Sequence, residues 1–329
     1  MALRALKLPE DFTSLADMVC DTFQYPENPD WSVQTDEKEE IGHAVRSFKR
    51  MWPLFRLLQA VSPSLRDLFR GYVAIEDGKI VGVTIIQRRG TTDAWGVDTV
   101  GVLPAYRRRG LARACLEKSL DMMKARGAKR TWLGVINGNT PAQRLYESLG
   151  FEVYDGILDY TLTDPVHQPI RPLLNGYTIS RLPDSDWKTR FDLERRIAPE
   201  ETRDYEPIEK GRFRRPLAMR LLYPITKLVQ RRKQADFVVR ESGGEVVGRF
   251  GYVVSLRGKG VNNLRIRLDP KHPNVAAHLF GKMLDDVISL SPKLRIEIGI
   301  PRWMPAVIAA AEACGFVKRV EYLKMGRAL

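Results

Sequence analysis

Residues 97–120 read VDTVGVLPAYRRRGLARACLEKSL, and this run joins a strand pattern directly to a helix pattern. Apolar residues alternate over Trp95–Val102, which predicts a β-strand. Over Arg109–Arg126 the apolar residues return at helical spacing, and Gly127 then ends the predicted helix. The junction is a basic loop at a helix start, where free backbone N–H groups and the helix dipole attract anions.

The loop has the composition of a phosphate-binding site. Gly110 has no Cβ, so a ligand can approach its backbone closely, and Ala112 is nearly as small. Four arginines surround these residues: Arg107, Arg108, Arg109 and Arg113. Phosphate binding is one interpretation of this loop, and a basic helix start that faces only water is the other.

The flanking segments predict alternating strands and helices. Two β-rich runs within Gly71–Gln87 flank an Asp-Gly step, which predicts a hairpin. Arg130–Ile136 predicts a further strand, and Pro141–Leu149 predicts a further helix that Gly150 closes. This order predicts the fold class α/β (α+β), in which a mixed central sheet with a parallel strand pair is flanked by helices.

The same order of elements returns in the second half of the chain. Val246-Val247-Gly248 repeats the pattern of Ile80-Val81-Gly82, and Gly315-Phe316 repeats Gly150-Phe151 at nearly the same offset. A constant offset at separate landmarks indicates an internal duplication.

A linker separates the two halves. Thr163–Gly176 contains closely spaced prolines and few periodic apolar residues. We therefore predict two domains, residues 1–165 and residues 166–329.

Two motifs in the first half are similar to those of the GNAT acetyltransferase superfamily. Arg107-x-x-Gly110-x-Ala112 matches the superfamily's motif A, Arg/Gln-x-x-Gly-x-Gly/Ala. Downstream, Asn139 precedes a predicted helix, Tyr146 follows seven residues later, and Leu149-Gly150-Phe151 comes next, as in the superfamily's following motif. The resemblance spans roughly residues 3–162 and predicts two tandem GNAT-like domains.

The resemblance implies an N-acetyltransferase with acetyl-CoA as cosubstrate. The backbone amides of a six-residue run would hold the pyrophosphate: Arg108, Arg109, Gly110, Leu111, Ala112 and Arg113. Val100, Gly101 and Val102 would pair with the pantetheine as a partial strand does. Asn139 would hydrogen-bond the same arm, and Tyr146 would protonate the departing thiolate, because a phenol is a donor and a weak acid. Packing of Tyr146 against the sheet is the alternative.

Direct attack on a thioester needs a neutral amine, so a base must remove a proton. Asp98 is the candidate, because strand alternation would place it on one face with Val100 and Val102. A structural aspartate that caps a turn or pairs with an arginine is the alternative. Cys115 lies on the apolar helix face and is predicted to be core.

The second half lacks the implied donor-binding groups. At aligned positions Arg107 becomes Pro273, Gly110 becomes Ala276, Ala112 becomes His278, Asn139 becomes Met304 and Tyr146 becomes Ala311. Proline also removes a backbone N–H. We therefore predict one active site per chain, in the first half, and a degenerate second half with a structural or acceptor-related role.

Charge is distributed unevenly. Residues 1–165 hold 22 Lys/Arg and 22 Asp/Glu, whereas residues 166–329 hold 31 and 18, so the net charge of +13 lies in the second half. Residues 210–233 contain nine basic residues and no acid. This segment predicts an acidic or phosphate-bearing acceptor, and a solvated basic face is the alternative. The rival function is a non-enzymatic module that senses acyl-CoA or binds nucleic acid or an anionic surface; acetylation of the kind carried out by mycothiol synthase is a related possibility.

The remaining composition suggests a cytoplasmic chain without metal. Cys20, Cys115 and Cys314 are far apart in sequence, and the four histidines are scattered, so we expect no metal site. The start of the chain has no apolar segment typical of a signal peptide, and no run is long enough to span a membrane.

Overall fold

The computed structural model describes residues 2–329, apart from 33–34, 63–64, 215–231, 257 and 259. Packing groups the chain into two compact units. Unit 1 comprises Met1–Tyr154, Asp204–Pro207 and Leu323–Leu329, and unit 2 comprises Asp155–Arg203 and Ile208–Tyr322. This grouping differs from a single division between residues 165 and 166, because each unit includes segments that are distant in sequence.

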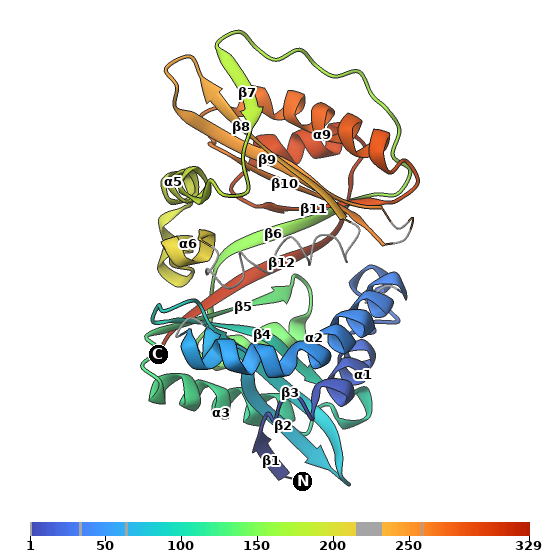
Figure 1. Ribbon diagram of the computed structural model, residues 1–329. Coiled ribbons are helices and arrows are strands. Elements are labelled where there is room, and N and C mark those ends of the chain that lie inside the picture. The colour runs from blue at the N-terminus through green and yellow to red at the C-terminus, as the bar shows by residue number, and fades with distance from the viewer. Residues whose placement is uncertain (1, 33–34, 63–64, 215–231, 257, 259) are drawn as a thin grey trace. The chain divides into compact units, whose positions relative to one another are not determined.

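Unit 1 is built on a sheet with strand order β1-β2-β3-β4-β5 (Figure 1). Strands β1 to β4 pair antiparallel, and β4 pairs with β5 in parallel. Its elements are β1 (Ala2–Ala5), α1 (Phe12–Thr22), η1 (Pro29–Trp31), α2 (Thr35–Val61), β2 (Arg70–Glu76), β3 (Lys79–Arg88), β4 (Ala94–Val102), η3 (Pro104–Tyr106), α3 (Leu111–Ala125), β5 (Arg130–Ile136) and α4 (Thr140–Ser148). The mixed sheet with flanking helices confirms the predicted fold class.

Helices cover both faces of this sheet. Leu111 and Cys115 of α3 pack against one face, whereas Leu15 and Met18 of α1 pack against the other. The predicted hairpin is confirmed: β2 and β3 join through Asp77 and Gly78, whose φ angles are 50° and 76°. Positive φ at both central residues is the type I′ geometry that suits the twist of two antiparallel strands.

Helix α3 follows its sequence pattern closely. Its buried residues are Leu111, Cys115, Leu116, Ser119, Leu120 and Met123, which recur at helical spacing on one face. Cys115 is completely buried, and burial raises the pKa of its thiol to about 11, as a core cysteine requires. The helix ends where Gly127 adopts a φ of 78°.

Unit 2 has strand order β6-β11-β10-β9-β8-β7. Its elements are β6 (Glu152–Leu162, which begins in unit 1), β7 (Tyr177–Arg181), α5 (Trp187–Ile197), α6 (Glu200–Tyr205, which ends in unit 1), α7 (Lys210–Phe213), β8 (Arg232–Glu241), β9 (Val246–Ser255), β10 (Asn262–Leu268), η4 (Pro273–Val275), α9 (Ala276–Leu290), β11 (Ile296–Pro301), α10 (Pro305–Ala313) and β12 (Val317–Ala328, which ends in unit 1). One large core joins α9 and α10 to the sheet. No helix or strand occurs between residues 163 and 176, where the sequence predicts a linker.

Unit 2 repeats the element order of unit 1. Strand β7 and helix α5 correspond to β1 and α1, and the hairpin β8-β9 corresponds to β2-β3. Strand β10, a 3-10 turn, α9, β11 and α10 then correspond to β4, η3, α3, β5 and α4. The repetition supports the predicted duplication.

The end of the chain belongs to the packing of unit 1. Met325 is 1% exposed and lies in one core with Phe151 and Tyr146, and Leu323 packs beside it. The backbone N–H of Leu329 donates to the carbonyl of Lys129 at 2.9 Å. Because these residues are hydrophobic and buried, the first half of the sequence does not contain the whole core of unit 1.

A second distant segment is fixed in the same unit. The Tyr154 and Tyr205 rings lie 4.7 Å apart, and Tyr154 donates to Glu206 at 3.0 Å. Lys324 also bonds Glu206 at 2.5 Å. A Cβ at Gly326 would lie 2.5 Å from the Tyr205 ring, so this position accepts only glycine without rearrangement.

Among the helices that the structure describes, none is long and apolar enough to cross a membrane.

Candidate active site

The basic loop has a backbone shaped for close approach. Strand β4 ends at Val102, and α3 begins after Gly110, which occupies the N-cap. Arg108 and Gly110 both have positive φ, at 65° and 76°. A Cβ placed at Gly110 would meet no atom within 4 Å, so packing does not require glycine here. The left-handed conformation favours it, and the first turn of α3 has the free backbone amides with which a helix start binds a phosphate.

The arginines of this loop have different surroundings. The Arg107 guanidinium donates to the carbonyls of Thr22 at 2.8 Å and Val102 at 3.3 Å, so this side chain fastens the loop to the end of α1. Arg109 pairs with Glu76 at 3.2 Å, and Arg113 donates to the Ser148 hydroxyl at 2.5 Å. Arg108 is exposed. All four keep positive charge around the helix start.

Strands β4 and β5 separate next to this loop. Their parallel ladder runs from the pair Ala94 and Arg130 to the pair Val97 and Leu133. Beyond Val97, β4 continues through Val100, Gly101 and Val102, which still pair with β3 on the other side. The edge of β4 that faces away from β3 is therefore available for an extended ligand to pair with.

Asp98 is the extra residue of a β-bulge. Val97 pairs with Ile86 and Thr99 pairs with Ile85, so Asp98 has no partner on β3. Val97 and Val100 both pack in the core that contains α3 residues, and Asp98 instead lies 3.5 Å from a Cβ built on Gly96 of the opposite face. The prediction that Asp98 shares a face with Val100 and Val102 is wrong, because the bulge interrupts the simple alternation of the strand.

The environment of Asp98 suits a group that exchanges a proton. The residue is exposed, yet the atoms around its carboxyl remove enough water to raise its pKa. A hydrogen bond from Gln87 and the charge of Arg89 oppose this rise and do not cancel it. Arg89 itself lies over the Trp132 ring, 4.5 Å from its centroid. A carboxylate with a raised pKa is a better base than an ordinary aspartate.

Asn139 and Tyr146 lie on α4. The Asn139 side chain caps this helix by accepting from the N–H of Ala142 at 3.4 Å. Tyr146 is 6% exposed and makes an edge contact with Phe151. Burial raises the pKa of the Tyr146 phenol, which keeps it protonated. The burial of Tyr146 fits a packing residue, and its protonated phenol fits a general acid, so both interpretations stay open.

Tyr25 belongs to the same neighbourhood, although no sequence pattern singled it out. Its hydroxyl oxygen accepts from Asn139 Nδ2 at 3.5 Å. Burial raises the pKa of Tyr25, and the charge of Arg107 opposes this rise. The pKa of Tyr146 is raised by burial and, to a smaller extent, by Tyr25. The residue follows α1 in a loop, more than a hundred positions before Asn139. Only the tertiary fold brings them together.

The corresponding region of unit 2 has lost the features of this loop. Helix α9 begins after Val275, whose φ is −86°, and Ala276 and Met304 are each 2% exposed. His278 bonds the Arg171 carbonyl, and Ala311 is completely buried. Pro273 lies in the 3-10 turn η4. None of these five positions offers the exposed left-handed backbone or the phenol found in unit 1.

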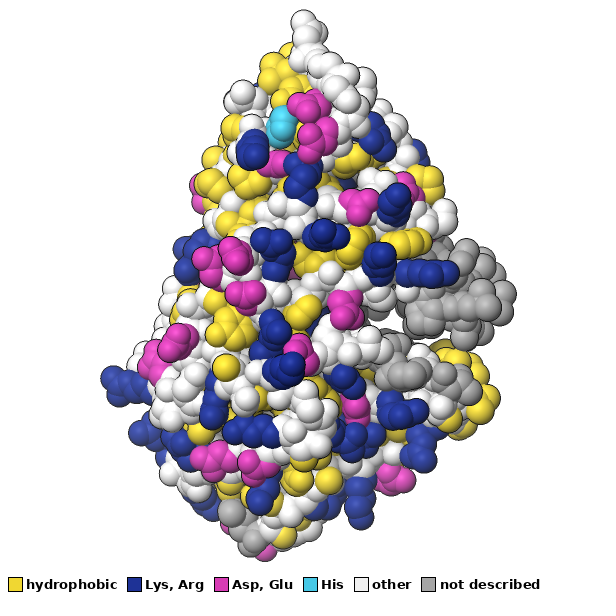
Figure 2. Space-filling view, turned by 90° about the vertical axis from the view of Figure 1, so that its left-hand side faces the viewer, with side chains coloured by type: hydrophobic (Ala, Val, Ile, Leu, Met, Phe, Trp, Pro, Cys, Tyr) yellow, Lys and Arg dark blue, Asp and Glu magenta, His cyan; other side chains and the backbone are white. Residues whose placement is uncertain are grey.

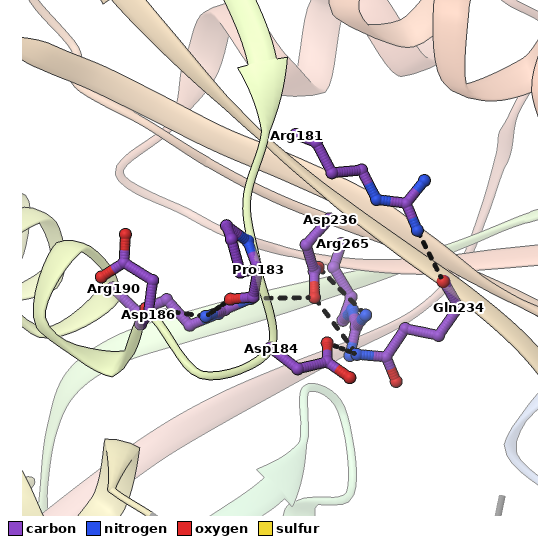
Figure 3. A network of polar contacts seen from close by, with 8 residues as sticks. All are labelled: Arg181, Pro183, Asp184, Asp186, Arg190, Gln234, Asp236 and Arg265. Carbon is purple, nitrogen blue, oxygen red and sulfur yellow. Dashed lines mark hydrogen bonds and ion pairs between the residues drawn. The ribbon is translucent and has the colours of Figure 1, made fainter.

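Unit 2 carries an ion-pair network around β10, the strand that corresponds to β4. Asp236 pairs with Arg190 at 3.3 Å and with Arg265 of β10 at 3.1 Å, and Gln234 and Asp184 join them (Figure 3). Beside it, Glu194 of α5 pairs with Arg249 at 3.4 Å and with Arg267 of β10 at 3.1 Å. Burial raises the pKa of Glu194, but the charges of Arg267 and Arg249 outweigh it and leave the pKa lowered.

The distribution of charged side chains can be followed on one face of the molecule (Figure 2). On the face drawn in Figure 2, Lys and Arg side chains are interspersed with acidic and apolar ones. Most of the basic segment 210–233 lies outside the described residues, at 215–231. Among the residues that are described, no group of three or more His, Cys, Asp or Glu side chains is arranged to hold a metal ion.

Comparison with known proteins agrees with these features. Residues 30–151 match the sequence profile of the acetyltransferase (GNAT) family. The chain is 30% identical over 134 residues to N-alpha-acetyltransferase 30 of Schizosaccharomyces pombe. The matched segment covers 40% of this chain and 79% of that protein. It is 40% identical over 85 residues to the [ribosomal protein bS18]-alanine N-acetyltransferase of Escherichia coli K12, covering 26% of this chain and 56% of that protein.

Solved structures share the fold over the whole chain. A tandem GNAT protein from the clavulanic acid biosynthesis pathway superposes with a TM-score of 0.63 at 13% identity, covering 99% of this chain and 98% of that one. A GCN5-related N-acetyltransferase from Sphaerobacter thermophilus gives a TM-score of 0.66 at 16% identity, covering 99% and 95%. The chain therefore belongs to the acetyltransferase (GNAT) family, whose members transfer an acetyl group from acetyl-CoA to an amine, and it is an N-acetyltransferase.

Proposed function

We propose that acetyl transfer takes place at one site per chain, in residues 1–165, and that residues 166–329 form a degenerate copy without a donor site. The observation that carries this proposal is the left-handed, exposed Gly110 loop next to an unpaired edge of β4. The equivalent start of α9 has neither the glycine nor the positive φ. The rival interpretation, a module without catalysis, gains no support from the relatives, which are named acetyltransferases.

In this proposal acetyl-CoA binds along β4 and the start of α3. The amides of Arg108 through Arg113 hold the pyrophosphate, with Arg107 shaping the loop from behind. Val100, Gly101 and Val102 pair with the extended pantetheine arm. Asn139 contributes its remaining N–H to the same arm. No metal takes part in the proposed reaction.

The proposed reaction is direct attack of an amine on the thioester carbonyl. The nitrogen–carbon bond forms, the carbon–sulfur bond breaks, and the departing thiolate takes the proton of Tyr146. The raised pKa of Tyr146 ensures that this proton is present at neutral pH. Asp98 accepts the first proton of the attacking ammonium, and its raised pKa favours that task. The second nitrogen proton is released to solvent as the amide forms, and the Tyr146 phenolate takes up a proton from solvent.

The acceptor wall in this proposal is formed by α1 and α2. Their aromatic side chains pack together with Phe69 through ring contacts of 5.1 to 6.2 Å: Phe12, Phe48, Trp52 and Phe55. Asp98, which is exposed, would remain accessible to an incoming amine. Because one relative is named an N-alpha-acetyltransferase and another a ribosomal protein bS18-alanine N-acetyltransferase, peptides with a free N-terminus are the first acceptors to test.

A second candidate is an acidic or phosphate-bearing acceptor, which the charge excess of residues 166–329 favours. Four arginines of unit 2 pair with Asp236 or Glu194, so their charges are not free to attract an anionic acceptor: Arg190, Arg249, Arg265 and Arg267. The test is acceptor affinity in a salt series for the wild type and an Arg212/Arg214/Arg215→Ala variant. Equal affinity without salt dependence would identify the basic segment as a solvated face.

Calorimetry and kinetics test the main proposal. We expect one acetyl-CoA bound per chain, and two comparable sites would contradict a degenerate second half. Tyr146→Phe should lower kcat about 100-fold, as loss of a general acid does, with little change in acetyl-CoA affinity. A loss confined to affinity would instead make Tyr146 a packing or binding residue. A cytoplasmic location stays a prediction.

A further inference from the structure

Tyr25 is held rigidly in the loop that follows α1. Its backbone N–H donates to the Ser32 hydroxyl at 2.8 Å, and its ring meets the Trp31 ring edge-on at 5.7 Å. Trp31 in turn lies against Gly138, where a Cβ would be 3.3 Å from the indole. The loop is therefore fastened onto the turn between β5 and α4, and a side chain in it has a defined position.

The Tyr25 hydroxyl contacts Asn139 of the proposed donor site, and its titration is coupled to two further residues of that site. It accepts from Asn139 Nδ2 at 3.5 Å, while Asn139 Oδ1 is occupied by the N–H of Ala142. Burial raises the pKa of Tyr25, and the charge of Arg107 opposes the rise. Burial raises the pKa of Tyr146, and the charge of the ionised Tyr25 phenol adds to this rise.

We propose that Tyr25 is a positioning residue for acetyl transfer, whose hydroxyl orients Asn139 and Tyr146 toward the thioester sulfur. The proposal rests on the function proposed above. Since the Tyr25 oxygen accepts from Asn139, its own hydrogen remains to be donated. Donated to the Tyr146 oxygen, it stabilises the phenolate that is left when Tyr146 gives its proton to the thiolate. That phenolate regains a proton from solvent, so the cycle closes without another reactant.

A packing role for Tyr25 would need only its ring, whereas a positioning role needs its hydroxyl. The edge contact with Trp31 uses only the ring, which phenylalanine also has. If Tyr25 only fills space, Tyr25→Phe changes nothing in catalysis. If its hydroxyl positions Tyr146, the same variant lowers turnover and leaves the loop in place. Tyr25→Phe therefore separates the two roles better than a larger truncation would.

The kinetic test combines both phenols. We expect Tyr25→Phe to lower kcat about tenfold, with acetyl-CoA affinity within about twofold of the wild type. The double variant Tyr25→Phe/Tyr146→Phe should be no slower than Tyr146→Phe, because residues that act through one another are not additive. Tyr72→Phe, a half-buried tyrosine of β2, is the matched control and should keep full activity. Unchanged kcat in Tyr25→Phe, or full additivity, overturns the proposal.

A second measurement needs no acceptor and so distinguishes this proposal from the function on which it rests. The protein is labelled with 3-fluorotyrosine, and the resonances of Tyr25 and Tyr146 are assigned by their Phe variants among the 11 tyrosines. Addition of CoA should shift both resonances, and Tyr25→Phe should shift that of Tyr146. If CoA binds and neither shift occurs, Tyr25 has no positioning role, whatever the turnover. If both shifts occur but no amine is acetylated, the proposed function fails and the contact stands.

Discussion

The two units place carboxylates in opposite electrostatic surroundings. In unit 1, Asp98 lies at a bulge, lacks a strand partner, and has a raised pKa. In unit 2, Glu194 is clamped by Arg249 and Arg267 and has a lowered pKa. A carboxylate whose charge is destabilised is ready to take a proton, whereas one whose charge is neutralised by two arginines serves the fold.

The helix starts differ in the same direction. Gly110 is exposed and left-handed, whereas the buried Ala276 continues an ordinary helical turn. His278 in unit 2 bonds the Arg171 carbonyl of the linker, so the start of α9 is contacted by the chain itself. The two units thus keep the same order of elements, while the exposed glycine of one helix start is replaced in the other by buried residues that the chain itself contacts.

The largest effect should come from removing the last part of β12, Leu323–Leu329, which belongs to unit 1. Deletion of Leu323–Leu329 removes Met325 from its core and exposes the residues that pack around it. We therefore expect unit 1 to unfold and acetyl-CoA binding to be lost. The point variant Met325→Ala should cost about 3 kcal/mol of unfolding free energy, and the exposed Val317→Ala of the same strand about 0.5 kcal/mol or less. Chemical denaturation measures both. A folded, acetyl-CoA-binding fragment of residues 1–165 would contradict this expectation.

The next effect concerns the ion pairs of Glu194 with Arg249 and Arg267 in unit 2. Glu194→Gln leaves Arg249 and Arg267 without their carboxylate, and we expect a loss of about 3 kcal/mol of stability, typical for one broken partner of a buried pair. Because the folded pKa of Glu194 is lowered, its stabilisation is present above the pKa of the unfolded chain and is lost as pH falls through the lower folded value. Acid titration of unfolding should therefore be flatter in Glu194→Gln, while acetyl-CoA affinity stays unchanged. A fall in affinity would show that unit 2 takes part in donor binding.

Gly110→Glu should weaken acetyl-CoA binding about 100-fold or more, which corresponds to about 2.7 kcal/mol. The new carboxylate would occupy the space proposed for the pyrophosphate and repel it. Gly127→Glu is the matched control, since Gly127 also has a positive φ, 78°, and open space around its Cβ, at the other end of α3. Calorimetry on both variants separates backbone strain from blockage. Equal affinities in the two variants would count against a donor site at Gly110.

The smallest effect should be at Asp98. Asp98→Asn should lower kcat/KM about tenfold and remove the acidic limb of its pH profile. Since the folded pKa of Asp98 is raised, its charged form opposes folding above that pKa, and the variant should be as stable as the wild type or slightly more stable at neutral pH. Asp93→Asn, which removes a surface partner of Arg130, serves as control. Lost stability with unchanged activity would identify Asp98 as a structural residue.

Local signals in the chain were sufficient to predict most elements and the helix start at Gly110. The hairpin at Asp77-Gly78, the strand Arg130–Ile136 and the buried face of α3 all appear where the pattern places them. These features depend on turn geometry and on periodic burial, which neighbouring residues specify. The different backbone of the second helix start was predictable in the same way, because Gly110 is replaced by Ala276 and Arg107 by Pro273, and glycine and proline act on their own backbone.

Three features needed the tertiary structure. The bulge that turns Asp98 away from Val100 arises from pairing with β3, so no alternation rule within β4 predicts it. Tyr25 reaches Asn139 only because its loop packs on the turn before α4. Met325 enters the core of unit 1 although it lies near the end of the chain. Each is a contact between distant residues, and its energy depends on surfaces that come together only when the chain has folded.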